Sequence, residues 1–308
     1  MRNHYIYSLP LFHSNSDPYC RYDCAFTSQI NLTENATSIQ HSFTSCKWKR
    51  CKAPIGGAIY FTPSNSQSSL IITDSQFLSC EATSTLGGGL YLSGVGTLQI
   101  TKSSFALCTA QATEDSGGGA MQFEKTSVSL LISSNDFVEC SSENDAGSIS
   151  CTQSTFTQSC CPFVNNRFVS CHSKNSTNGG GGGILLWSNP TAFGVSNNIF
   201  ARCTSLLMGG GIHLALPSDR YSSFIKFCFF ASNSSPHGKD VHIKFSQTEN
   251  WNNVFLHSFT TDTTKSLGKN WPNPTDVSGD SSIWLPLTNN SENFCYYCTL
   301  AKTASYKQ

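Results

Sequence analysis

The chain has no excess of charge of either sign. Lysine and arginine together number 19, aspartate and glutamate also number 19, and charged residues make up only 12% of the sequence. Nucleic acids and anionic membranes are attracted mainly by a basic electrostatic field. Because this chain has no such field, we expect nucleic acid not to be among its partners.

Long apolar runs and helical patterning are also missing. No stretch of 18 apolar residues occurs, so we expect no membrane span in this chain. Residues 1–10 carry one arginine and are interrupted by Pro10, which makes a poor secretory signal. No segment keeps apolar residues at i, i+3 and i+4 for more than a turn, and paired glycines would cost a helix about 1 kcal/mol per residue. The sequence therefore predicts an all-β chain.

What the sequence does contain is a tetrad that starts with phenylalanine and ends with cysteine or asparagine. It recurs with an average spacing of about 31 residues. A fixed period of this size is typical of stacked units, none of which buries its apolar face alone. The seven copies are Phe43/Cys46, Phe77/Cys80, Phe105/Cys108, Phe137/Cys140, Phe168/Cys171, Phe200/Cys203 and Phe230/Asn233.

A glycine-rich tetrad that ends in an apolar residue follows each phenylalanine tetrad. Glycine suits a sharp bend at which φ is positive and a neighbouring coil passes close by. The copies are Gly56-Gly57-Ala58-Ile59, Gly87-Gly88-Gly89-Leu90, Gly118-Gly119-Ala120-Met121, Ala146-Gly147-Ser148-Ile149, Gly181-Gly182-Gly183-Ile184, Gly209-Gly210-Gly211-Ile212 and the degenerate Gly238-Lys239-Asp240-Val241.

These two series predict a right-handed parallel β-helix of about seven to eight coils. Apolar and polar residues alternate before each phenylalanine, as at Leu70 and Ile72, and a short second strand follows each glycine pair. A leucine-rich repeat has a shorter period, and a propeller blade needs about 40 residues. In a β-helix, equivalent residues stack about 4.8 Å apart, so phenylalanine, cysteine and the apolar residue after the glycines should form buried ladders.

The same pattern divides the chain into three parts. We expect an N-terminal coil or cap in 1–40, the repeats in 41–245, and a C-terminal cap with a cysteine-containing tail in 246–308. Phe12 and Asn15 resemble an earlier copy of the tetrad. Trp251, Trp271 and Trp284 belong to the segment that loses the period, which we expect to shield the last sheet edge.

Fifteen cysteines is an odd number, so at least one is free or pairs between chains. Six lie in the phenylalanine tetrads, where a ladder of buried free thiols is favoured over disulfides between neighbouring coils. The Cys295-Tyr-Tyr-Cys298 spacing lacks the second pair that zinc requires, so we expect no metal and no other cofactor. The better disulfide candidates are Cys20/Cys24, Cys46/Cys51, Cys151/Cys160/Cys161 and Cys295/Cys298.

No catalytic arrangement is evident. A polygalacturonase-like site needs closely spaced carboxylates, and the chain has no Asp-Asp pair. A calcium-dependent lyase could assemble Asp74, Asp136 and Lys102 across coils, but we interpret these as solvated outward residues. His213 is likewise interpreted as an outward strand residue. His237, Asp240 and His242 form a cluster in sequence, in which Asp240 fits the motif of a closing coil.

In register, the GGA-I and F-x-x-N/C tetrads resemble the polymorphic outer-membrane protein repeats of chlamydial surface proteins and the related β-helix families of parasitic protists. Gly56-Gly57-Ala58-Ile59 has the family form, and cysteine at six tetrads is similar to the protist branch. The resemblance covers about two thirds of the chain. It implies an adhesin-like or antigenic role at the cell surface or outside the cell.

The sequence thus predicts a non-enzymatic protein that binds an unknown protein or glycan through its side face and loops. The variable loops are His172–Asn178 and Ser150–Cys161. The alternative is a pectate-lyase-like enzyme with a site assembled across coils. A third reading is a paralogue that has lost its function.

Overall fold

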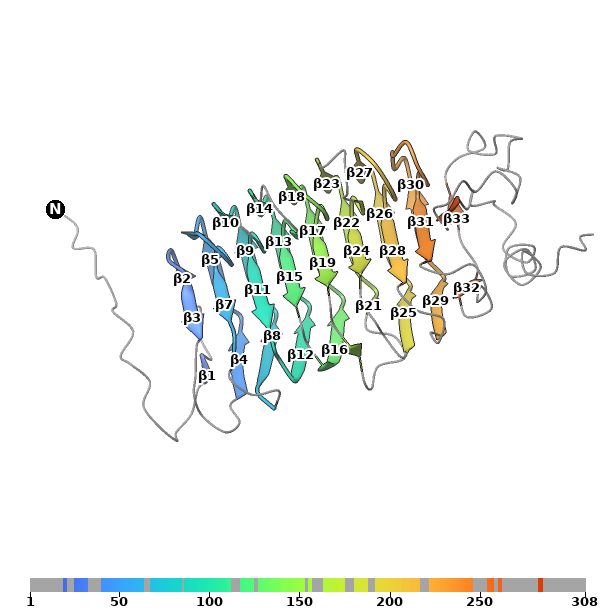
Figure 1. Cartoon of the computed structure of the whole chain (residues 1–308). Helices are drawn as coiled ribbons and strands as arrows, with labels where there is room; N and C mark the ends of the chain where they lie inside the picture. Colours follow the sequence, from blue (N-terminus) through green and yellow to red (C-terminus); the bar gives the residue numbers. More distant parts are fainter. Residues whose placement is uncertain are drawn as a thin grey trace, which may run out of the picture.

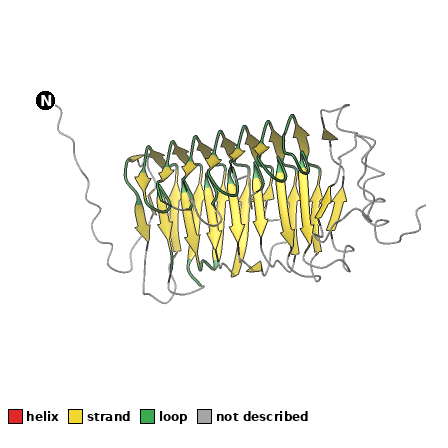
Figure 2. Cartoon of the chain, turned by 45° about the horizontal axis from the view of Figure 1, so that its top comes forward, coloured by secondary structure: helices red, strands yellow, loops and turns green. Residues whose placement is uncertain are grey.

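The chain forms an all-β, parallel β-solenoid, seen from the side in Figure 1. Among the residues that the computed structural model describes there is no helix. Figure 2 shows that the coils stack side by side along one axis, with the turns between sheets aligned in ridges. The described residues are 19–20, 25–32, 40–63, 67–84, 86–111, 117–124, 127–152, 155–156, 163–174, 180–187, 192–216, 222–245, 254–257, 260–261 and 282–284.

Each coil passes through four sheets, here named A, B, D and C in chain order. Sheet A carries the apolar alternation that precedes each aromatic residue, and its strands pair in parallel register. Its strands are β1 (Tyr19–Cys20), β4 (Gln40–Thr44), β8 (Ser69–Thr73), β12 (Thr97–Thr101), β16 (Ser127–Ser133), β21 (Phe163–Val164), β25 (Ala192–Ser196), β29 (Ser222–Lys226) and β32 (Val254–His257), with β20 (Thr155–Phe156) paired to β16.

Sheet B carries the aromatic residue at the centre of its three-residue strands. Its strands are β2 (Ala25–Phe26), β5 (Lys47–Lys49), β9 (Gln76–Leu78), β13 (Ser104–Ala106), β17 (Asp136–Val138), β22 (Arg167–Val169), β26 (Ile199–Ala201), β30 (Phe229–Ala231) and β33 (Thr260–Thr261). Sheet D is narrower, with two-residue strands β6 (Lys52–Ala53), β10 (Glu81–Ala82), β14 (Thr109–Ala110), β18 (Ser141–Ser142), β23 (His172–Ser173) and β27 (Thr204–Ser205).

Sheet C follows the glycine turn and closes the coil. In Figure 1 its strands stand side by side along the whole solenoid. They are β3 (Ile30–Leu32), β7 (Ile59–Phe61), β11 (Leu90–Ser93), β15 (Met121–Glu124), β19 (Ile149–Thr152), β24 (Ile184–Trp187), β28 (Ile212–Leu216), β31 (Val241–Phe245) and β34 (Ser282–Trp284). Only β34 runs antiparallel, against β31.

The glycine columns are required by the distance between coils. A Cβ atom added at Gly57 would overlap the carbonyl oxygen of Gly88, and one added at Gly88 would overlap that of Gly119. Backbone therefore packs directly on backbone at this turn, as the sequence pattern predicted, and any side chain would push the coils apart.

Two further turns use non-glycine residues with φ between 51° and 59°. Left-handed backbone costs an L-residue about 1–2 kcal/mol. Hydrogen bonds to the next coil offset this cost, as when the amide of Asp74 donates to the carbonyl of Thr101. The first column joins sheets A and B, and the second joins sheets B and D. They are Ser45, Asp74, Lys102, Ser134, Asn165, Asn197 and Phe227, then Arg50, Ser79, Leu107, Glu139, Ser170, Arg202 and Ser232.

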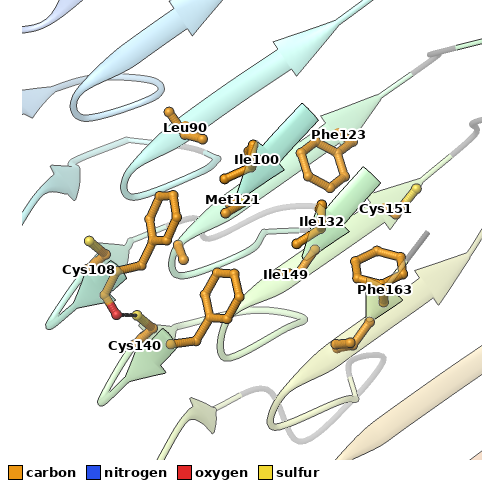
Figure 3. Packing of buried hydrophobic residues seen from close by; sticks show 14 of the residues in the cluster. Leu90, Ile100, Cys108, Met121, Phe123, Ile132, Cys140, Ile149, Cys151 and Phe163 are labelled. Atoms are coloured by element: carbon orange, nitrogen blue, oxygen red, sulfur yellow. Dashed lines mark hydrogen bonds between the residues drawn. The ribbon is translucent and has the colours of Figure 1, made fainter. Parts of the chain in front are cut away.

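A continuous aromatic stack runs through the core. Neighbouring ring centroids lie 4.4 to 5.2 Å apart, and the planes of each pair are nearly parallel. The apolar residues of sheets A and C pack beside it, as Figure 3 shows for Ile100, Met121 and Ile132. The stack consists of Phe26, Trp48, Phe77, Phe105, Phe137, Phe168, Phe200 and Phe230. The predicted in-register ladder is therefore confirmed from Phe77 to Phe230.

The first predicted tetrad, Phe43/Cys46, was in the wrong register. Phe43 lies in β4, where it pairs with Ile72 of sheet A and is only partly buried. Trp48 occupies the aromatic position instead and stacks on Phe77 at 4.4 Å. The error has a physical cause: the aromatic position accepts a tryptophan ring as well as a phenyl ring, so a search for phenylalanine alone selected a neighbouring apolar residue.

Strands of the array also occur in the N-terminal part expected to be a coil or cap and in the C-terminal part expected to be a cap. β1, β2 and β3 already pair with the coil that follows, before residue 41. β32 and β33 continue sheets A and B in parallel register after residue 245. Trp284 lies in β34, which pairs with the last strand of sheet C. Trp251, Trp271 and the Phe12/Asn15 tetrad lie outside the described residues.

This register predicts a large difference between two nearby aromatic residues. Trp48→Ala should lower the free energy of unfolding by about 3–5 kcal/mol, because it leaves a gap in a fully buried stack. Phe43→Ala should cost clearly less, because that side chain is partly exposed. Chemical denaturation of both variants measures the difference, and equal losses would contradict the register.

Candidate functional site

Five of the six cysteines in the predicted tetrads, together with Cys51, form one ladder inside the turn between sheets B and D. Each Sγ lies 3.4 to 3.7 Å from the carbonyl oxygen of the aromatic residue one coil earlier and donates to it. The dashed line at Cys140 in Figure 3 marks one such contact. Asn233 ends the ladder, and its Nδ2 donates to Phe200 in the same way at 3.0 Å. The members are Cys51, Cys80, Cys108, Cys140, Cys171, Cys203 and Asn233.

The sulfur ladder includes two central thiols that are held in the protonated form. Its cysteines are buried and free. Burial raises the pKa of the Cys108 and Cys140 thiols well above the ordinary value. A thiol that keeps its proton is neither a strong nucleophile nor a metal ligand. The favoured interpretation of the tetrad cysteines as buried thiols therefore agrees with the structure.

The suggested Cys46/Cys51 disulfide was wrong. Both residues are buried free thiols, and they belong to different turns of the same coil. Cys46 lies before β5 and donates to the carbonyl of Thr44, whereas Cys51 lies after β5. Cys151 is also buried, in β19 of sheet C. Cys24, Cys160, Cys161, Cys295 and Cys298 lie outside the described residues, as does the side chain of Cys20.

A second polar ladder, which the sequence analysis missed, occupies the turn between sheets A and B. In each coil a side-chain oxygen accepts from the backbone amide of the equivalent residue one coil earlier. Asn166 is typical: its Oδ1 accepts from the amide of Asn135 at 3.0 Å, and its Nδ2 donates to the carbonyl of Ile132 at 2.8 Å. The column runs Cys46, Ser75, Ser103, Asn135, Asn166, Asn198. The signal was a Ser or Asn two residues before each aromatic residue.

The three residues named for the lyase alternative do not share one position of the repeat. Asp74 and Lys102 lie in the left-handed column before β9 and β13, whereas Asp136 lies in β17 and is paired with Arg167 at 2.8 Å. Asp136 therefore does not belong to the column of Asp74 and Lys102. Asp74 accepts from the Ser45 hydroxyl at 3.2 Å. Within the described ranges, no group of three or more His, Cys, Asp and Glu side chains could hold a metal ion.

His213 occupies an outward strand position, as predicted, but its side chain is buried. His213 and His242 are buried and stack edge to face, with centroids 4.8 Å apart, although both occupy outward positions of sheet C. Asp240 is buried with them in the last coils and accepts from Nδ2 of Asn233 at 2.9 Å. His237 is exposed. The outer face of sheet C is covered at this end, which strand alternation alone does not reveal.

The outer face of sheet B differs from the other exposed faces. Eight large apolar side chains are exposed in the described part of the chain, and five of them lie on sheet B or at its two turns. They are Leu78, Leu107, Ile199, Phe227 and Phe229. Small apolar residues join them in one outward column, which runs Leu78, Ala106, Val138, Val169, Ala201 and Ala231.

Charge is unevenly distributed over the same face. Lys47, Lys49 and Arg50 are exposed at its first coil. Asp136 and Arg167 form a mutually neutralised pair at its centre. The coils of β26 and β30 present Ile199, Phe227 and Phe229, Arg202 is exposed at the turn after β26, and no charged residue lies on β30 itself. We refer to this surface as the sheet B face.

The predicted side loops fall mostly outside the described residues. For His172–Asn178 the structure describes 172–174, where Nδ1 of His172 lies 2.7 Å from the Thr204 hydroxyl and Lys174 pairs with Glu143 at 2.6 Å. For Ser150–Cys161 it describes 150–152 and 155–156. Ser150 is buried in β19, and β20 pairs with β16.

The asparagine ladder predicts a sharp requirement at one position. Asn166→Ala should lower the free energy of unfolding by about 2–5 kcal/mol, because it leaves the Asn135 amide and the Ile132 carbonyl buried and unpaired. Asn166→Ser is the matched control and should cost less, since serine fills the same rung at Ser75 and Ser103. Equal effects in equilibrium unfolding would argue against the ladder.

The thiol ladder predicts a denaturation-dependent reactivity. In the folded protein Cys80, Cys108, Cys140 and Cys171 should resist alkylation, because they are buried and, for Cys108 and Cys140, hold their protons. After denaturation all four should react. Mass spectrometry of non-reduced peptides measures both states, and a Cys80–Cys108 linkage would contradict the ladder of free thiols.

No helix in the described segments has the length and apolar character to cross a membrane. No protein-family model matches the sequence, and neither does any curated protein or solved structure. The fold and the side chains that it exposes are therefore the basis for inferring a function.

Proposed function

We propose that the chain is a non-enzymatic, surface-type binding protein that attaches to its partner through the sheet B face. The observation that carries the proposal is the gathering of exposed apolar side chains on this face. Ile199 is 39% exposed, Phe227 57% and Phe229 38%, and they lie on adjacent coils. Contiguous apolar patches on soluble proteins mark interaction sites more often than isolated apolar residues do.

The repeat architecture supports this use of the face. The inward side chains of each strand form the ladders. Only the two outward side chains of each sheet B strand can therefore vary without disturbing the core. From β9 to β30 the face is about 24 Å long at one strand spacing per coil and about 10 Å wide. A stable interface buries about 800 Å² per partner. A single contact on this narrow face is therefore weak, and many copies on one surface would bind by avidity.

The chemistry of the face favours a protein over a glycan as its partner. Aliphatic and phenyl groups gain most from burial against other apolar groups. The coils of β26 and β30 offer three such side chains. The strand β30 carries no polar side chain that could orient a sugar. The lysines and Arg50 at the first coil would orient a partner that carries acidic groups.

The proposal also covers the handedness of the solenoid, its number of coils and its C-terminal cap. We take the solenoid to be right-handed, since parallel crossover connections are right-handed in about 98% of cases. We take it to have about seven to eight coils and a C-terminal cap, which is supported by β34 pairing with the last sheet C strand. The glycine and aromatic columns support kinship with the polymorphic outer-membrane protein repeats and, with it, a location at the cell surface.

The proposal predicts a loss of attachment without a loss of fold. In an Ile199→Ser, Phe229→Ser double variant, saturable attachment of the purified protein to a panel of cultured cells should fall at least about tenfold, since two hot-spot side chains are removed. Leu131→Ser is the matched control, because Leu131 is similarly exposed on sheet A. Unchanged attachment of the double variant, with normal thermal unfolding, would overturn the proposal.

A separate measurement tests the absence of catalysis. Purified protein incubated with polyuronates and neutral glycans, with and without calcium, should yield no more cleaved product than a denatured control. Product above that control would favour the lyase alternative.

A further inference from the structure

Five asparagines of the chain stand in the motif Asn-X-Ser/Thr, in which X is not proline. This is the acceptor motif for N-linked oligosaccharides in proteins that follow the secretory route. The motif alone does not show which asparagine is used, whereas the surroundings of each side chain can. The five are Asn31, Asn35, Asn175, Asn233 and Asn289, and the structure describes Asn31 and Asn233.

Asn233 has no room for a sugar in the folded protein. Its side chain is buried, and its Nδ2 donates to the carbonyl of Phe200 at 3.0 Å and to Oδ1 of Asp240 at 2.9 Å. An N-linked sugar replaces a hydrogen on this nitrogen and needs open space beside it. The fold therefore excludes this copy of the motif.

Asn31 has the opposite surroundings. It is exposed on the outward side of β3, the first strand of sheet C, which lies at the start of the solenoid in Figure 1. On an inner strand, a glycan would meet outward side chains from two neighbouring coils, each about 4.8 Å away. Among the described strands of sheet C, β3 has a neighbour on one edge only. The first coil is thus the least crowded place on this sheet.

The neighbouring coil supplies an aromatic surface in the same register column. Asn31 pairs with Tyr60, and Tyr60 pairs with Tyr91. The two tyrosine rings stack with centroids 5.4 Å apart and planes 12° apart, and the Tyr91 hydroxyl donates to Oε2 of Glu124 at 2.8 Å. Because one face of the half-buried Tyr60 ring lies against Tyr91, its other face is turned toward the coil of Asn31.

We propose that Asn31 is the acceptor for an N-linked oligosaccharide whose first sugar packs on the ring of Tyr60. The C–H face of a pyranose ring is apolar, so its burial against an aromatic face is favourable. Thr33 completes the motif in the sequence and lies outside the described residues. The inference rests on the proposed cell-surface location, because proteins on that route meet the glycan donor. It adds a covalent modification on sheet C.

The transfer needs one co-substrate, an oligosaccharide joined to a lipid through a diphosphate. Nδ2 of Asn31 forms a bond to C1 of the first sugar while the bond between C1 and the diphosphate oxygen breaks. The lipid diphosphate leaves with the electron pair of that bond, and the proton lost from Nδ2 passes to a base of the transferase. Nothing is oxidised or reduced.

Occupancy is tested on the full chain, directed into the secretory pathway of a eukaryotic host by a removable leader. Asn35→Gln is present throughout, so that mass spectrometry of the peptide containing residue 31 reports this site alone. The peptide should carry a glycan, Thr33→Ala should abolish it, and Thr33→Ser should retain it. Folded protein without a glycan at Asn31, or with one at Asn233 instead, would overturn the inference.

The packing on Tyr60 is tested by a thermal double-mutant cycle in the same host. Asn31→Gln removes the glycan and should lower Tm by about 2 °C or more. In a Tyr60→Ala background the same change should lower Tm by less than about half as much, because the sugar has lost its aromatic surface. Trp187→Ala is the matched control, since it removes an exposed aromatic side chain from a distant strand of sheet C and should preserve the full difference.

An equal Tm difference in the parent and in the Tyr60→Ala background would overturn the packing of the sugar on this ring. These outcomes are independent of attachment, because the Ile199→Ser, Phe229→Ser variant can be assayed with Asn31→Gln present. An unmodified Asn31, together with loss of attachment in the sheet B variant, would overturn this inference alone and leave the proposed function standing.

Discussion

Every coil must lie one strand spacing from an equivalent coil, and the rest of the molecule depends on this constraint. Backbone amides of one coil donate to carbonyls of the next throughout the four sheets. Each residue therefore meets its own counterpart above and below, and a position tolerates only side chains that stack on themselves. Flat aromatic rings, thiols, amides and the bare glycine backbone meet that condition. Lysine and arginine do not, because like charges repel at this spacing, and those described lie in the outward columns and at the turns.

The same constraint explains why both cysteine and asparagine occur at the end of the aromatic tetrad. Both are small, and both donate to the carbonyl of the aromatic residue one coil earlier, as Cys203 and Asn233 do. Asparagine adds an acceptor, which Asn233 uses for the backbone amide of Cys203. In the turn between sheets A and B the side chains act mainly as acceptors, and most of them are serine or asparagine. The two ladders together satisfy backbone groups that a tight turn would otherwise leave buried and unpaired.

Because the interior side chains must stack on their own counterparts, variation between coils is concentrated on the outer faces. The sheet B face collects exposed apolar side chains at the coils of β26 and β30. This surface requires no change in any ladder. A solenoid of this kind can therefore vary its outer faces while its core remains the same.

The sequence by itself determined the architecture, because a period of about 31 residues with glycine pairs and aromatic tetrads permits few folds. It also determined the rungs from Phe77 onward, since identical spacing implies identical position. Tertiary structure alone decided the rest. Trp48 rather than Phe43 begins the regular tetrads because ring stacking depends on register, not on residue type. His213 and His242 are buried although strand alternation points them outward, because other parts of the chain cover them. The sheet B face joins exposed apolar side chains from several coils, and no local pattern records that neighbourhood.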